Sequence, residues 1–214
     1  MKCTVRPEHA GKSSGHHNDS SAFDEKSYVY TLAKAVPQVP SSFFDTSREL
    51  SNEIELMLTT VSLPERCFIL VEETIPKGMY VDPDQLRDIS EFTGLRTFVA
   101  ANVDVEKPEF EAEVFRLFVF RELEPQENLR VTRADVPVHL RYHKPREPTD
   151  LERARHEQPM AIVRMQNPRL LLSCEGENFA TACPDRMVSS FCDSSGSTKC
   201  EYLNLPYRAV GTTS

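Results

Sequence analysis

Two acidic residues, Asp82 and Asp84, flank Pro83 in the pattern by which many nucleotide-sugar transferases hold a divalent metal ion. In such a site the two carboxylates supply hard oxygen ligands to an ion that also binds a diphosphate. The same residues suit the start of a helix, with Asp82 as the N-cap, Pro83 at the first helical position and Asp84 complementing the helix dipole. Gln85 would then close an arrangement like a capping box. We favour the helix cap and keep a metal-dependent glycosyltransferase as an alternative.

His139 and His143 have the spacing that places two imidazoles on one face of a helix, as in zinc proteases. The segment that carries them, residues 136–143, instead has the pattern of a strand, along which four residues span about 13 Å. That distance is too long for two histidines to share one ion, so no metal site is predicted. On a strand His139, Arg141 and His143 would share a polar face opposite Tyr142. We interpret this face as a solvent-exposed polar row, with a partner-binding stripe as the alternative.

Six cysteines are present, and four of them fall in the last 41 residues. None of the spacings gives the close C-x2-C pairs that present two thiolates to one zinc ion. Disulfides are therefore the favoured interpretation, and they indicate an oxidising compartment. The sequence leaves the connectivity open. The disulfide candidates are Cys67, Cys174, Cys183, Cys192 and Cys200.

Other catalytic signatures are missing from the sequence. It contains no G-x-S-x-G, no G-x-G-x-x-G and no P-loop, and its seven glycines are scattered. We therefore predict no catalytic residue and no cofactor.

The formal net charge of -8 argues against nucleic acid as a partner, because proteins that bind the phosphate backbone usually carry a basic surface. No run of apolar residues approaches the length of a membrane span, and the first ten residues lack the apolar core of a signal peptide.

The first 45 residues are rich in Ser, His, Lys and Pro and show no sustained apolar period, so we predict a disordered N-terminal arm there. Asn18 begins an N-glycosylation sequon in this arm. From residue 53 onward, short alternating or β-branched runs predict strands, with one short helix after a turn at residues 75–78. The expected strands cover residues 53–59, 67–71, 114–121, 131–142, 160–165, 170–174 and 202–210. The fold class is therefore all-β, an antiparallel sandwich-like domain over about residues 46–210 with a tail at 211–214.

Three stretches together resemble the PIG-X family, the accessory subunits of the GPI mannosyltransferase I complex. The first runs from Cys67 to Leu86 and resembles the family's cysteine, apolar strand and IPxGxYVDPxxL run. The second, Val136 to Pro145, is similar to the family's PVHxRYHxP motif and is the most diagnostic segment. The third, Asn167 to Cys174, is echoed by Lys199 to Tyr202. The resemblance covers about residues 50–210.

The resemblance implies a non-catalytic, β-rich domain on the lumenal side of the endoplasmic reticulum membrane. It implies that this domain stabilises PIG-M, the mannosyltransferase subunit that carries the chemistry. That complex transfers the first mannose from dolichol-phosphate-mannose to the glucosaminyl-phosphatidylinositol intermediate of GPI-anchor synthesis. The family continues into a C-terminal transmembrane helix where this sequence has residues 211–214, so we expect a truncated or alternative product.

The resemblance leaves the partner-binding surface open. The candidates are the polar row of the second motif and the turn of the first, namely His139, Arg141, Tyr142, His143, Met79 and Tyr80. Exposed His, Arg and Tyr side chains suit mixed polar and aromatic contacts. The main alternative to the accessory subunit is a secreted, disulfide-linked recognition module with another ligand.

Overall fold

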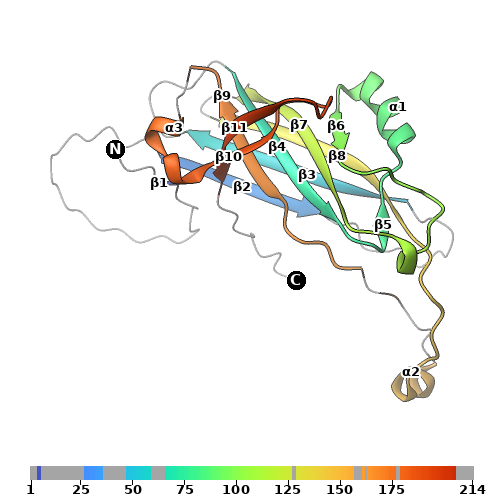
Figure 1. Ribbon diagram of the computed structural model, residues 1–214. Helices are drawn as coiled ribbons and strands as arrows, with labels where there is room; N and C mark the ends of the chain where they lie inside the picture. Colours follow the sequence, from blue (N-terminus) through green and yellow to red (C-terminus); the bar gives the residue numbers. More distant parts are fainter. Residues whose placement is uncertain are drawn as a thin grey trace, which may run out of the picture.

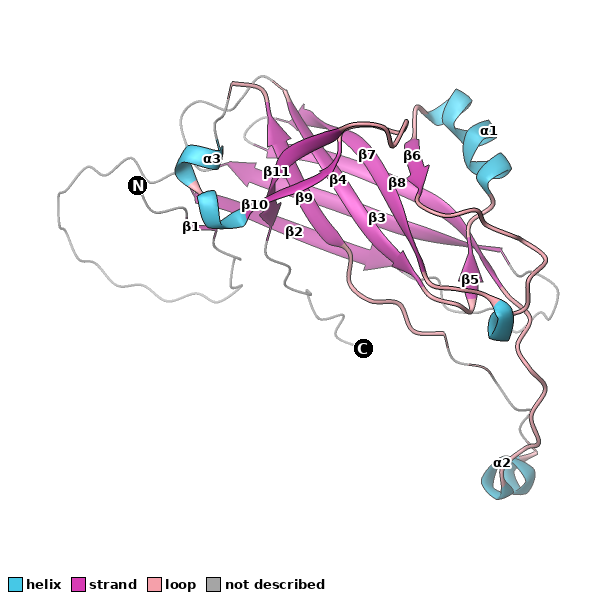
Figure 2. Cartoon of the chain, viewed as in Figure 1, coloured by secondary structure: helices cyan, strands magenta, loops and turns pink. Residues whose placement is uncertain are grey.

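The fold is known from a computed structural model that describes residues 4–5, 27–35, 47–58, 66–126, 129–156, 161, 163–176 and 179–205. The strands form two layers, and short helices lie at the two ends (Figures 1 and 2). One layer contains, in order, β1 (Thr4–Val5), β2 (Ser27–Ala35), β3 (Ser47–Leu58), β8 (Leu129–Leu140) and β5 (Met79–Tyr80). The other contains β6 (Arg96–Val99), β7 (Phe115–Gln126), β4 (Cys67–Ile75), β9 (Arg169–Cys174), β11 (Lys199–Leu205) and β10 (Met187–Phe191).

The two layers are joined through the β7–β8 hairpin. Most of β7 pairs with β4, but its last three residues, Glu124–Gln126, pair with the start of β8. Every strand pair is antiparallel except β1 with β2. The predicted all-β, antiparallel sandwich is confirmed.

Alternation along the strands places the main core between the layers. Ile69 and Val71 of β4 are fully buried there, together with Leu117 of β7 and Val136 of β8. The opposite face of β4 and β7 carries a second, smaller cluster, which the β10–β11 hairpin covers. This outer cluster contains Leu70, Phe118, Phe120, Leu171 and Tyr202, with Phe98, Val188 and Phe191 packed against it.

In the described ranges, five short helical segments connect the strands. They are α1 (Pro83–Thr93), α2 (Asp150–Arg155), α3 (Phe179–Ala182) and the 3-10 turns η1 (Glu109–Glu111) and η2 (Pro184–Arg186). The sequence predicted only one short helix, which corresponds to α1. Helix α2 stands apart from the two layers (Figure 1), and a complete capping box between Thr149 and Glu152 begins it. None of the helices in the described ranges is long and apolar enough to cross a bilayer.

Several expected strands need correction. The segment 160–165 was expected to be a strand, but its described residues, 161 and 163–165, lie outside any strand. Strand β2 falls inside residues 1–45, the part of the chain expected to be disordered. Strands β5, β6 and β10 were not predicted. The division at residues 45 and 210 stays a prediction.

The expectation of disulfides is confirmed. Cys67 and Cys174 lie opposite each other on β4 and β9 and are bonded. Cys192 and Cys200 close the loop between β10 and β11. Cys183 is also disulfide-bonded.

Candidate functional site

The first two family-like stretches meet at one end of the sandwich. Strand β5 pairs with the end of β8, so that Tyr80 lies opposite His139 and their rings stack with centroids 4.9 Å apart. The amide of Arg141 donates to the carbonyl of Gly78 at 2.9 Å. Gly78 is the last residue of the turn expected at residues 75–78, and its φ is not positive. A Cβ there would lie 2.7 Å from Val163 Cγ2. A glycine is needed at this position because two segments approach the backbone closely.

Asp82 is the N-cap of α1, as predicted. Its Oδ1 accepts the amides of Asp84 at 2.9 Å and Gln85 at 3.4 Å, and Asp84 pairs with Arg87 at 2.8 Å. The expected capping box is wrong, because the Gln85 Oε1 forms its hydrogen bond with His139 Nε2 at 2.8 Å. The motif thus ties α1 to β8. Across the described part of the chain, no three His, Cys, Asp or Glu residues cluster closely enough to hold a metal ion.

Arg141 is buried, with 7% of its surface exposed, and the expectation of a solvent-exposed side chain is wrong for it. Its Nη1 donates to the carbonyls of Asp104 at 2.8 Å and Lys107 at 2.6 Å, and its Nε donates to the carbonyl of Met79 at 3.3 Å. The guanidinium carbon lies 4.8 Å from the centre of the Tyr80 ring. Burial lowers the pKa of Arg141 from its ordinary value, and burial raises the pKa of Tyr80.

Tyr142 is 84% exposed, although the strand pattern placed it on an apolar face. The physical reason is that β8 ends at Leu140, so the alternation of faces stops before this residue. His143 is partly buried, and its Nδ1 lies 3.9 Å from Glu109 Oε2. Met79 is buried and packs in the core. Among the partner-binding candidates, Tyr142 therefore presents the largest exposed fraction.

Beside Arg141 lies a cavity of about 680 Å³ that the sequence did not predict. Its lining comes from the loop between β6 and β7 and the start of β7, with one residue of β4. The lining residues are Thr74, Ala100 to Asp104, Lys107, Ala112 to Arg116 and Arg141. The sequence feature that could have drawn attention to this region is the run of acidic residues around Phe110. Asn18, the glycosylation candidate, lies outside the described residues.

These features define a disulfide-linked β-sandwich domain in which the motif residues hold α1, β5 and β8 together. A family model described as PIG-X / PBN1 matches residues 38–212. The chain belongs to this family.

Three named relatives are similar to this chain. The "GPI alpha-1,4-mannosyltransferase I, stabilizing subunit" of Homo sapiens is 27% identical over 146 residues, which cover 67% of this chain and 53% of the relative. The proteins of the same name from Rattus norvegicus and Mus musculus are 23% and 22% identical over 148 residues, or 68% of this chain. Those alignments cover 55% and 54% of the two rodent proteins. The chain spans about half the length of the relatives it matches.

Proposed function

We propose that this chain is a non-catalytic stabilising subunit of GPI mannosyltransferase I. It binds PIG-M on the lumenal side of the endoplasmic reticulum membrane and keeps that catalytic subunit folded and abundant. PIG-M then transfers the first mannose from dolichol-phosphate-mannose during GPI-anchor synthesis. The observation that carries the proposal is membership of the PIG-X / PBN1 family together with the similarity to three relatives named as stabilizing subunits of GPI alpha-1,4-mannosyltransferase I.

The contacts of the motif residues support a structural contribution. Asp82 caps a helix, His139 holds that helix to β8, and Arg141 holds the loop that follows β6. These polar groups are used within the fold itself. Because these groups bond within the domain, a partner binds the surface that they hold in place.

The test is carried out in cells that lack this protein. We expect PIG-M abundance to fall and conversion of glucosaminyl-phosphatidylinositol to its mannosylated product to fall with it. Return of the full gene product should restore both, while the activity per PIG-M molecule stays constant. Unchanged PIG-M abundance in the deficient cells would reject the proposal.

A double variant separates stabilisation from catalysis by this chain. Asp82→Asn with Asp84→Asn removes both carboxylates of the possible metal site, yet keeps a cap because asparagine also caps helices. We expect this variant to restore PIG-M and mannose transfer as the wild type does. Normal PIG-M abundance with lost transfer would instead indicate a metal-dependent enzyme.

A further inference from the structure

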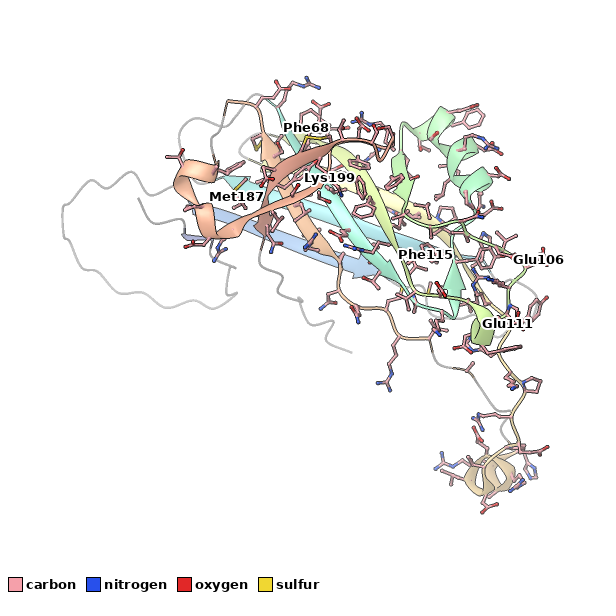
Figure 3. All side chains as sticks on the ribbon, viewed as in Figure 1. Phe68, Glu106, Glu111, Phe115, Met187 and Lys199 are labelled. Carbon is pink, nitrogen blue, oxygen red and sulfur yellow. A yellow bond between two sulfur atoms is a disulfide. The ribbon has the colours of Figure 1, made fainter. Side chains whose placement is uncertain are left out.

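One end of the sandwich concentrates negative charge. Residues 100–114 contain five acidic residues and one lysine, whereas the whole chain of 214 residues has a net charge of -8. Figure 3 shows Glu106 and Glu111 at this end, together with Phe115, and shows Met187 and Phe68 toward the other end. We call this region the acidic end and define it by Glu106, Glu111 and Glu113 with Phe110, Val114 and Tyr142.

The three carboxylates of the acidic end have no counter-ion among the residues that the structure describes. Glu106, Glu111 and Glu113 are exposed, and none forms an ion pair with another residue in the described ranges. Elsewhere carboxylates are neutralised, as where Arg66 binds Glu122 at 2.9 Å. The negative potential of the acidic end is therefore available to a partner.

Apolar side chains lie among these carboxylates. Tyr142 is 84% exposed, Val114 54% and Phe110 50%. The amide of Glu109 donates to the carbonyl of Tyr142 at 2.9 Å, so η1 and the segment after β8 lie side by side. An aromatic and aliphatic surface with a charged rim is typical of a protein-binding surface.

The cavity beside Arg141 opens within the same end. Val114 and Glu113 line it, as does Arg141. The Nε and Nη1 atoms of Arg141 donate to three backbone carbonyls, while its Nη2 makes no hydrogen bond to any residue that the structure describes. The remaining donor can bond one more acceptor, such as the carbonyl of a bound peptide.

We propose that the acidic end binds an extended, lysine- or arginine-rich segment of the catalytic subunit; this inference rests on the function proposed above. The basic side chains of that segment meet Glu106, Glu111 and Glu113. Its apolar side chains pack on Phe110 and Tyr142, and a side chain or a backbone carbonyl enters the cavity beside Arg141.

The charges favour this occupant over an anionic one. A phosphate or an anionic lipid headgroup in the cavity would approach Asp104 and Glu113, which line it, and the carboxylates around its rim. Of the three cations in the lining, Arg116 is already 2.8 Å from the buried Glu72 carboxylate and Arg141 donates to three backbone carbonyls, which leaves Lys107 facing the two carboxylates. An anionic ligand would be repelled, since like charges at an interface cost several kcal/mol.

The test compares two charge-matched double variants of the full chain by co-purification with tagged PIG-M. Glu106→Lys with Glu111→Lys alters the acidic end. Asp185→Lys with Glu201→Lys makes the same change of charge at exposed positions of η2 and β11. We expect the first variant to lose about tenfold in captured PIG-M at low salt and the second to match the wild type.

Raising the salt from about 50 to 300 mM should weaken wild-type capture, because screening shortens the reach of exposed charges.

A milder variant distinguishes a loss of charge from misfolding of the lysine variant. Glu106→Gln with Glu111→Gln removes the charge without reversing it and should give an intermediate loss at an unchanged melting temperature. Capture equal to the wild type by both variants of the acidic end would overturn this inference and leave the proposed function standing. Failure of the wild-type chain to capture PIG-M would overturn the proposed function and the inference together. Salt-independent capture, or equal losses in both lysine variants, would also count against a specific acidic surface.

Discussion

The guanidinium of Arg141 accounts for much of the local structure around the motifs. It donates to the carbonyl of Met79 in β5 and to the carbonyls of Asp104 and Lys107 in the connection between β6 and β7, and it lies against the Tyr80 ring. The sequence showed a polar residue in an alternating pattern and could not show that three carbonyls would converge on it. That convergence depends on the path of residues 100–108, which no local pattern specifies.

At this residue we expect Arg141→Leu to lower the free energy of unfolding by about 3 kcal/mol, because three carbonyls lose their donor. The neighbouring Tyr142→Ala should change it by no more than about 0.5 kcal/mol, since that side chain is 84% exposed. Urea unfolding of the two purified variants measures both values. Equal effects would show that the hydrogen bonds of Arg141 contribute little.

At the scale of elements, strands with their own strong pattern were predicted and strands that depend on a neighbour were not. β4, β7 and β9 carry β-branched, aromatic or leucine runs, and the sequence predicted each of them. β10 has the sequence MVSSF, with two serines, and is ordered through five register pairs with β11. The apolar run at 160–165 shows the converse, since hydrophobic residues alone do not make a strand without a partner.

The β10–β11 hairpin offers a test of how an element is held against the sheet. Gly94 and Gly196 have nearly equal φ values, 65° and 66°, so alanine meets a similar backbone penalty of about 1 kcal/mol at each. A Cβ on Gly94 meets nothing within 4 Å, whereas a Cβ on Gly196 would lie 2.3 Å from the Phe98 ring. The Phe98 ring in turn packs against Phe118 and Phe191.

We therefore expect Gly196→Ala to lower the free energy of unfolding by about 1–3 kcal/mol more than Gly94→Ala, because the aromatic cluster must shift. Thermal or urea unfolding of the two variants gives the comparison, and Gly94→Ala is the matched control for the backbone term. Equal losses at the two positions would mean that Phe98 moves aside at no cost.

For the whole molecule, the acidic end illustrates what the sequence could and could not provide. The charge run of residues 100–114 and the motif at 136–145 were both visible in the sequence. Their proximity was not, because it arises when β5 pairs with β8 and the loop after β6 closes over Arg141. The net charge of the chain argued against nucleic acid as a partner but did not locate a binding surface.

The two disulfides with described partners act on the whole chain to different extents. Cys67 and Cys174 are separated by 107 residues, and Cys192 and Cys200 by 8. A crosslink that closes a longer loop removes more entropy from the unfolded chain.

We expect Cys67→Ala with Cys174→Ala to lower the free energy of unfolding by about 2 kcal/mol more than Cys192→Ala with Cys200→Ala. Denaturant unfolding of the two double variants, each keeping its other disulfides, measures the difference. A larger loss for the Cys192 and Cys200 variant would indicate that this bond stabilises mainly through native packing of the β10–β11 hairpin on the outer cluster, and would make that hairpin central to the stability of the domain.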